Sequence, residues 1–262
     1  MSSWEAVVLG IVQGATEFLP VSSSGHLVMA QALLGIELPG VFFEVAVHVA
    51  TLFSVLLVYR ERVAKLLLGA MRREGEAWRY LGLILLASVP AGLVGVLFED
   101  AIEALFDSPW VVGVALVVTG ALLWSTKAAQ RRREAWGHVD ARGALTMGFA
   151  QAFAIIPGIS RSGTTVVAGL WTGVEAGEAA AFSFLMSVPA IGGAALLQVP
   201  ELMEGTPGLG GPALLAGSVA AAVTGVLAIR TFVSMLRKKT FHSFGLYCWA
   251  AGGLFMAWLA LR

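Results

Sequence analysis

Hydrophobic residues in this chain form six long apolar runs that are separated by short polar stretches. Each run has about 17 to 20 residues, which is the length that an α-helix needs to cross the hydrocarbon core of a bilayer. We therefore predict full membrane spans at roughly 41–59, 80–98, 110–126, 181–199, 213–232 and 245–261.

Two further apolar stretches break off after about half a span. The first is interrupted at Pro20 by the letters PVSSSG, and the second by the letters PGISRSGTT, which begin at Pro157. A helix as short as any of the four resulting pieces does not comfortably reach across the bilayer. We predict two re-entrant helix–loop–helix hairpins that enter the membrane and return, with helical pieces at about 4–19, 26–34, 144–156 and 166–173.

The two halves of the chain align without a gap at an offset of 138 residues, and the hydropathy runs follow the same offset. Three full spans per half would insert the second copy upside down. We therefore predict an all-α polytopic membrane protein of one domain, an inverted-topology repeat of about 1–138 and 139–262. Each half would hold one re-entrant hairpin and three of the six full spans. The residues that match are Gly10 with Gly148, Gln13 with Gln151, Ser22 with Ser160, Ser24 with Ser162, and Gly25 with Gly163.

Composition agrees with a membrane protein, since 58% of the 262 residues are hydrophobic and only 13% are charged. The net charge is zero, but the signs are separated by loop. The acidic loops hold Glu99, Asp100, Glu103 and Asp107, and Glu201 and Glu204. Three basic loops hold all but two of the 17 basic residues: Arg60, Arg62, Lys65, Arg72, Arg73 and Arg79; Lys127, Arg131, Arg132, Arg133 and Arg142; Arg230, Arg237, Lys238 and Lys239.

The positive-inside rule places the three basic loops in the cytoplasm. Both chain ends then lie on the outer side, the first hairpin enters from that side, and the second enters from the cytoplasm. The N-terminal letters MSSWEAVVLG contain no basic residue, so we expect no cleavable signal peptide. The single cysteine, Cys248, excludes an internal disulfide and is expected to be buried.

Arg161 is the one basic residue inside the apolar background, and a charge at that depth requires a partner or a polar cavity. Its neighbours suit a phosphate group, because glycines allow close backbone approach and hydroxyls donate hydrogen bonds. The guanidinium fork matches phosphate oxygens. We predict a phosphate-binding loop that contains Gly158, Ser160, Ser162, Gly163, Thr164 and Thr165.

In an inverted repeat the two broken segments meet near the bilayer midplane. The second loop would then lie against a reactive cluster in the first half. Gln13 and Glu17 share a helical face there, as do Glu44 and His48 in the next span. The predicted cluster consists of Gln13, Glu17, Ser22, Ser23, Ser24, Gly25, His26, Glu44 and His48.

Each of these residues also has a structural interpretation. Ser22 to Ser24 are typical helix caps, and the two roles can coexist. Arg161 and Glu17 can form an ion pair that only holds the fold, although buried pairs are an expensive way to do so. Glu44 and His48 can be interfacial groups near the outer rim.

The strings QGATEFLPVSSSGH and PGISRSGTT resemble the two signatures of the bacterial undecaprenyl-pyrophosphate phosphatase family, as do FFEVAVH and FSFLMSVP. The resemblance covers the whole chain. It implies hydrolysis of undecaprenyl pyrophosphate to the monophosphate lipid carrier of cell-wall synthesis, in the bacterial cytoplasmic (inner) membrane, with a site open to the outer face. Gln13 stands where many relatives have Glu, so a site with two carboxylates for a metal is less secure here.

The chemistry requires charge neutralisation, a nucleophile and a proton acceptor. Arg161 and the phosphate-binding loop would hold the phosphate oxygens, and Ser23 or a water molecule would attack the terminal phosphorus. We favour Ser23, which is also the nucleophile that the resemblance implies, with His26 as its base. Glu17 would orient His26 or bind Mg²⁺ or Ca²⁺, which prefer oxygen ligands.

A polyprenyl-phosphate lipid flippase or an anion transporter is the alternative, because broken helices in inverted repeats are typical of alternating access. A carrier needs the anion site but has no use for a nucleophile and base. We expect the lipid and the membrane as partners and no nucleic acid, and the sequence leaves open whether the chain forms a homodimer.

Overall fold

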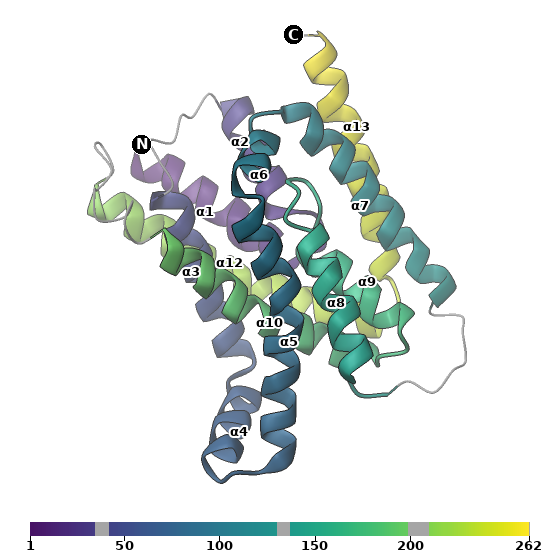
Figure 1. Cartoon of the computed structure of the whole chain (residues 1–262). Coiled ribbons are helices and arrows are strands. Elements are labelled where there is room, and N and C mark those ends of the chain that lie inside the picture. Colours follow the sequence, from purple (N-terminus) through teal and green to yellow (C-terminus); the bar gives the residue numbers. More distant parts are fainter. Residues whose placement is uncertain (35–41, 130–136, 199–209, 262) are drawn as a thin grey trace.

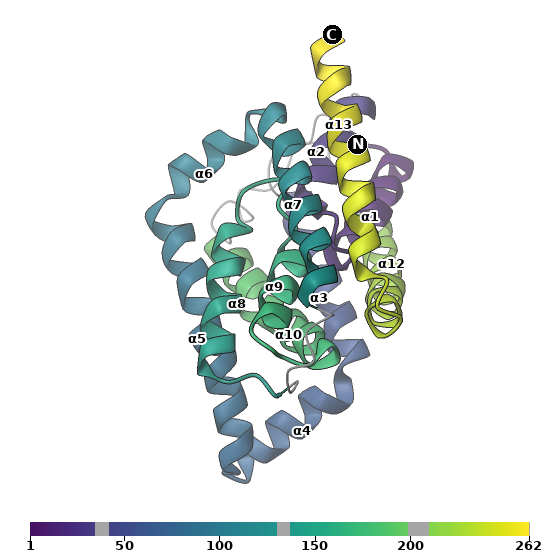
Figure 2. The same cartoon turned by 90° about the vertical axis from the view of Figure 1, so that its right-hand side faces the viewer.

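The computed structural model describes residues 1–34, 42–129, 137–198 and 210–261, and these ranges form a bundle of α-helices (Figures 1 and 2). No β-strand occurs within them. The helices are α1 (Ser3–Phe18), α2 (Ser23–Leu34), α3 (Phe42–Val58), α4 (Arg60–Met71), α5 (Gly75–Leu97), α6 (Glu99–Phe106), α7 (Pro109–Ala129), α8 (Ala141–Phe153), α9 (Arg161–Trp171), α10 (Ala176–Leu197), α12 (Gly211–Arg237), the short 3₁₀ turn η1 (Phe241–Ser243) and α13 (Phe244–Leu261).

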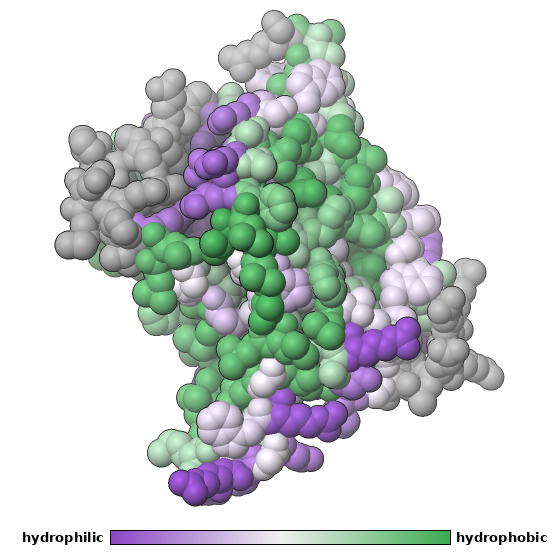
Figure 3. All heavy atoms as spheres, viewed as in Figure 1, coloured by the Kyte–Doolittle hydropathy of each residue, from purple (hydrophilic) through white to green (hydrophobic). Residues whose placement is uncertain are grey.

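Five helices, α5, α7, α10, α12 and α13, are long and apolar enough to cross a membrane, and α3 with α4 brings the number to as many as six. This agrees with the predicted polytopic all-α class. Exposed apolar residues recur every four positions along single helices, as at Leu85, Val89, Leu93 and Leu97 of α5. Figure 3 shows the hydrophobic surface as a band with hydrophilic residues at both ends. A face of this kind suits lipid and not water.

Two predicted loops are helical instead. The stretch that begins at Arg60 forms α4, which bends away from α3 by 79°, and the acidic stretch at Glu99 forms α6. Most residues of α4 are strong helix formers: Arg, Glu, Lys, Leu, Ala and Met. The prediction of a loop used the charge of this stretch and not its helix propensity. The predicted basic residues Arg131 to Arg133 and the acidic residues Glu201 and Glu204 lie outside the described ranges.

The two interrupted stretches are helix–break–helix units, α1 with α2 and α8 with α9 (Figure 1). Ser2 caps α1, since its hydroxyl accepts from the Glu5 amide and the Glu5 carboxylate accepts from the Ser2 amide. Helix α1 ends at Phe18, and the next residue, Leu19, has a ψ of 145°, the extended backbone that a following proline favours.

The first helix of each unit packs against a long helix from the other half of the chain. Helix α1 lies on α12, and α8 lies on α5. Both contacts use small residues: a Cβ atom at Gly10 would collide with the carbonyl of Gly217, and one at Gly148 would collide with the carbonyl of Ala87. The units are therefore held between the long helices by direct backbone contact, which fixes where their breaks lie.

Both termini lie at the end of the molecule that also carries α6, and α4 lies at the opposite end (Figures 1 and 2). This agrees with the prediction that the two chain ends share one side of the membrane. It leaves the identity of that side as a prediction.

The α1–α12 contact generates a stability prediction. Gly10→Ala should lower the free energy of unfolding by about 1–3 kcal/mol, because the added methyl group meets backbone and cannot be accommodated by a side-chain rotation. At roughly 2–4 °C per kcal/mol, the loss is measurable as a lower melting temperature in detergent.

The matched control is Gly82→Ala in α5, where an added Cβ has no neighbour within 4 Å. Its melting temperature should equal or exceed that of the unsubstituted protein. Equal melting temperatures for the two variants would contradict close packing of α1 on α12.

Candidate active site

The two helix breaks have the same local hydrogen bonds at equivalent positions. Ser22 Oγ accepts from the Gly25 amide at 3.3 Å, and Ser160 Oγ accepts from the Gly163 amide at 3.1 Å. Each of these hydroxyls also lies 3.3 Å from a second one, that of Ser24 and that of Ser162 respectively. Ser22 and Ser160 therefore cap α2 and α9, and the cap at Ser22 agrees with the structural interpretation of Ser22 to Ser24.

The tips of the two breaks touch each other. An added Cβ at Gly25 would lie 3.2 Å from Gly158 Cα, and one at Gly163 would lie 3.0 Å from Pro20 Cβ. Gly158 has a φ of 94° and Ser22 has a φ of 69°, so the backbone passes through the left-handed region at each of the two breaks. The predicted meeting of the two loops is present.

Helix α7 anchors the second break. The Thr119 hydroxyl donates to the Gly158 carbonyl at 3.0 Å and accepts from the Ser160 amide at 3.1 Å. Ser162 Oγ donates to the carbonyl of Leu19 at 3.3 Å and so reaches the first break directly. The start of α9 is thus fixed against both α7 and α1.

Glu17 is the centre of the site. Its Oε1 accepts from Arg161 Nη2 at 2.5 Å, while its Oε2 accepts from Ser23 Oγ at 2.6 Å and from Gln13 Nε2 at 3.0 Å. The Glu17 side chain is only 6% exposed and that of Arg161 16%. One buried carboxylate therefore joins the guanidinium of the second break to the hydroxyl of the first.

His48 of α3 reaches the same carboxylate. Its Nδ1 donates to the Glu44 carbonyl at 2.7 Å, and its Nε2 lies 3.7 Å from Glu17 Oε2. Nε2 can donate toward Glu17 only when both ring nitrogens carry a proton. Glu44 accepts instead from Gln31 Nε2 of α2 at 3.1 Å, so that it lies beside the site without joining Glu17.

The hydrogen bonds of His26 go to other partners than the ones named in its predicted role. Its Nδ1 lies 2.8 Å from the Ser22 carbonyl, to which it donates, and its Nε2 lies 2.8 Å from the Tyr247 hydroxyl. Within the described ranges, its hydrogen bonds join it to neither Ser23 nor Glu17. Ser23 is bonded to Glu17 instead, which makes the carboxylate the nearest proton acceptor for that hydroxyl.

The two threonines of the phosphate-binding loop differ in their partners. Thr165 Oγ1 donates to the Arg161 carbonyl at 2.7 Å and lies 2.6 Å from Ser183 Oγ of α10. Thr165 therefore ties α9 to α10. Thr164 Oγ1 is buried and has no hydrogen-bond partner among the described residues.

Several other buried polar atoms also lack a partner in the part of the chain that the structure describes. Two belong to side chains bonded to Glu17, Arg161 Nη1 and Gln13 Oε1, and two more are the amide nitrogen and oxygen of Gln151 in α8. Unpaired buried donors and acceptors cost free energy, so a cluster of them at one site indicates a polar ligand. Arg161 Nη1 supplies a donor to an anion, and Gln13 Oε1 supplies an acceptor to a cation.

The sequence reasoning missed two residues of this site, Gln31 and Tyr247. Both are single polar residues in apolar runs and belong to no motif that contains the others. Tyr247 is separated from His26 by 221 positions, so only the packing of α13 brings them together.

Known proteins resemble the chain over its full length. The model of the family described as bacitracin resistance protein BacA matches residues 6–254. The undecaprenyl-diphosphatase of Syntrophotalea carbinolica is 41% identical over 263 residues, which covers 98% of this chain and 99% of that protein. The undecaprenyl-diphosphatase of Moorella thermoacetica is 40% identical over 266 residues and covers all of both chains. The Salinibacter ruber protein of that name is 41% identical over 268 residues, which covers 97% of this chain and 98% of that protein.

The strings QGATEFLPVSSSGH and PGISRSGTT contain Glu17, Ser23 and Arg161, which meet in the structure. They lie in an all-α chain with several helices long enough to cross a membrane. With the family model matching nearly the whole length, the chain belongs to the bacitracin resistance protein BacA family.

Proposed function

We propose that this chain is a membrane phosphatase that hydrolyses undecaprenyl pyrophosphate to undecaprenyl phosphate and inorganic phosphate. The observation that carries the proposal is the bonding of Glu17 to both Arg161 and Ser23. An anion-binding guanidinium and a hydroxyl with an adjacent base are then within reach of one phosphate group. The activity named for the relatives supports this assignment.

The architecture that we propose is an inverted repeat with two re-entrant units. It is supported by the exchanged packing of α1 on α12 and α8 on α5, and by the equivalent caps at Ser22 and Ser160. The distribution of basic residues supports an inner-membrane protein with basic loops in the cytoplasm. In that orientation both termini are outside and the site opens to the outer face.

The terminal phosphate binds at the start of α9 in this proposal. Its side-chain donors are Arg161 Nη1 and the Thr164 hydroxyl, which have no partner among the described residues, and the helix N-terminus adds a favourable dipole. The buried pair with Glu17 holds the guanidinium in place before the anion arrives, which lowers the cost of organising the site. The prenyl chain remains in the apolar surroundings of the helices.

Ser23 is the nucleophile. Its Oγ forms a bond to the terminal phosphorus as the bridging P–O bond breaks, the hydroxyl proton passes to Glu17 Oε2, and undecaprenyl phosphate leaves. Water then attacks the phosphoserine and gives a proton to a base that later releases it to solvent, the P–Oγ bond breaks as inorganic phosphate leaves, and the proton on Glu17 returns to Ser23 Oγ. His26 is the base for that water once its Nε2 separates from Tyr247.

The donor set also fits the predicted Mg²⁺ or Ca²⁺. Such ions bind through one or two carboxylates together with substrate phosphates, and Gln13 Oε1 is an unpaired buried oxygen beside Glu17. Glu17 and Gln13 would hold the ion. When bound, it would neutralise part of the charge of the pyrophosphate.

Replacing Arg161 tests the anion site. Arg161→Gln should reduce phosphate release from a short-chain prenyl pyrophosphate by roughly 10²–10³-fold, because a stabilising cation is lost at the reacting phosphate. Arg161→Lys should recover only part of the rate, since an ammonium lacks the two-pronged geometry. Phosphate release is measured in detergent, with the melting temperature recorded for each protein.

Arg79→Gln serves as the control, because Arg79 is an exposed cation outside the site. Unchanged activity in Arg161→Gln would remove the proposed site. Binding of the lipid by unsubstituted protein without any phosphate release would favour the carrier alternative.

Ser23→Ala tests the covalent route. Phosphate release should fall by about 10³-fold or more, as for other enzymes that lose their nucleophile. In unsubstituted protein, acid quenching during turnover should trap phosphate on the peptide that contains Ser23, which mass spectrometry detects. The control is Ser88→Ala, whose hydroxyl donates only to the Ile84 carbonyl. A Ser23→Ala rate near that of the unsubstituted protein would exclude the serine route and leave direct attack by water.

Removal of divalent ions tests the cation. Chelation should reduce phosphate release at least tenfold, and added Mg²⁺ or Ca²⁺ should restore it. Gln13→Glu, which adds a second carboxylate, should lower the ion concentration needed for half-maximal activity. Full activity in excess chelator would contradict a role for the ion while leaving the Arg161 and Ser23 results unaffected.

A further inference from the structure

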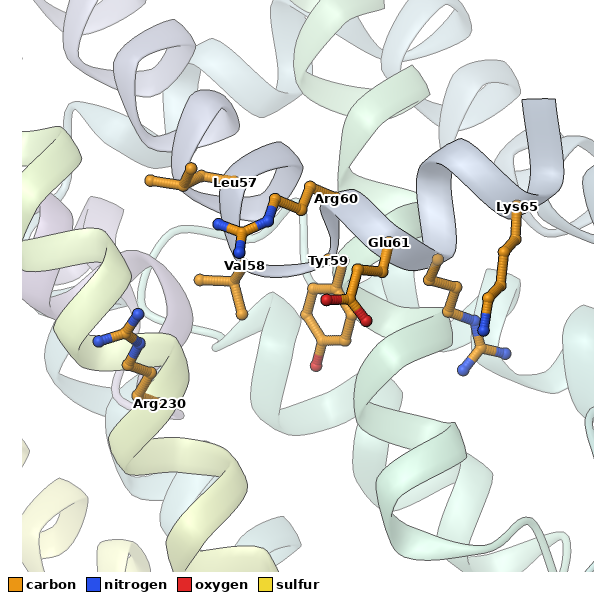
Figure 4. Close-up of a pocket in the computed structure, with 8 residues that line it drawn as sticks. Leu57, Val58, Tyr59, Arg60, Glu61, Lys65 and Arg230 are labelled. Atoms are coloured by element: carbon orange, nitrogen blue, oxygen red, sulfur yellow. The ribbon is translucent and has the colours of Figure 1, made fainter. Parts of the chain in front are cut away.

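A hollow of about 690 Å³ lies at the bend between α3 and α4, at the opposite end of the molecule from the chain termini (Figures 1 and 4). Arg230 of α12 lines its other side. Its walls come from α3, from α4 and from α12, which lies far from the other two in the sequence. The residues that line it are Leu57, Val58, Tyr59, Arg60, Glu61, Arg62, Lys65 and Arg230.

Cations dominate this hollow. Arg62 is neutralised, because it forms an ion pair with Glu178 and lies 4.7 Å above the ring of Tyr80. Arg60, Lys65 and Arg230 form no ion pair within the described ranges, and Glu61 is the one acidic residue in the lining. Three uncompensated cations therefore face one carboxylate, an arrangement that attracts an anion.

The cations come from different helices. Arg60 and Lys65 are in α4, whereas Arg230 is in α12, and the side chains of Arg60 and Arg230 extend from the two walls of the hollow (Figure 4). Like charges on facing elements repel each other unless an anion lies between them. A phosphate group suits that place, because its several oxygens accept from two guanidinium groups at once.

The surroundings of the cations are apolar. Leu57 forms part of the wall and is 54% exposed, and Leu67, Leu68 and Met71 are exposed on α4. Because α4 turns by 79° from α3 and carries both apolar and charged residues, it suits the boundary between lipid chains and water. A phosphate held here would have hydrocarbon beside it.

We infer that this hollow is a second anion site, separate from the one at Glu17, that binds the phosphate of an anionic lipid headgroup between α4 and α12. Basic pockets between membrane helices on the cytoplasmic side bind anionic lipid headgroups in this way. The bound phosphate would join α4 to α12, on which α1 and hence Glu17 pack. A free phosphate ion has the same chemistry without the apolar contact.

The test compares two triple variants that remove equal charge. The pocket variant is Arg60→Gln, Lys65→Gln, Arg230→Gln, and the control is Arg72→Gln, Arg79→Gln, Lys238→Gln, which removes exposed cations that do not line the hollow. Native mass spectrometry of delipidated protein would count bound phosphatidylglycerol and phosphatidylcholine at equal ionic strength. Unsubstituted and control protein should bind one phosphatidylglycerol at least tenfold more tightly than phosphatidylcholine, and the pocket variant should lose that preference.

Equal losses in the two triple variants, or no preference in the unsubstituted protein, would overturn the site and leave only diffuse surface charge. Melting temperatures measured in inorganic phosphate and in chloride distinguish a free phosphate ion from a lipid headgroup as the bound anion. Stabilisation by phosphate only in proteins with an intact hollow would show that the phosphate group suffices. Stabilisation by phosphatidylglycerol alone would show that the lipid chain is needed. Should the pocket variant fold poorly, Arg230→Gln alone should weaken phosphatidylglycerol binding about threefold. Because the readout is binding, it is independent of phosphatase activity.

Discussion

The buried ion pair between Glu17 and Arg161 is the interaction on which the rest of the site depends. Removing two charges from water is costly, and the attraction between them compensates only when the remaining hydrogen-bonding positions are also filled. Ser23 and Gln13 fill those on Glu17, and His48 lies close by. The pair therefore requires α1, the start of α2 and the start of α9 to be in place together, which couples the local fold to the chemistry.

Close backbone contact is what allows that meeting. The breaks touch at Gly25 and Gly163, where the neighbours of an added Cβ would be Gly158 and Pro20. Behind them, α1 rests on α12 at Gly10, so that the break cannot move away from the long helices. A Cβ atom at Gly25 or Gly163 would be tighter against the other break than most Cβ contacts, so the neighbouring atoms would have to move. Small residues here have a direct energetic role, because they set the distance between Glu17 and Arg161.

Residue patterns predicted the helical membrane class, the two interrupted units and the contact between their breaks, because hydropathy runs and a charge at bilayer depth follow from transfer free energies. They did not predict α4 or α6, since polar helices at an interface carry no long apolar run. Gln31 and Tyr247 were also missed, because their contacts arise from packing between distant helices. That His26 takes the proton of Ser23 stays a prediction, and the hydrogen bond that the Ser23 hydroxyl donates in the described residues goes to Glu17.

The sequence offset of 138 can be compared with the contacts around Glu17 in the described residues. Ser23 and Arg161 are equivalent positions at this offset, and each reaches the same carboxylate from its own break. The position equivalent to Glu17 is Ile155, and that equivalent to His26 is Thr164. The ion pair at Glu17 thus joins unlike side chains of the two halves, with the carboxylate and the Ser23 hydroxyl from the first half and the guanidinium from the second.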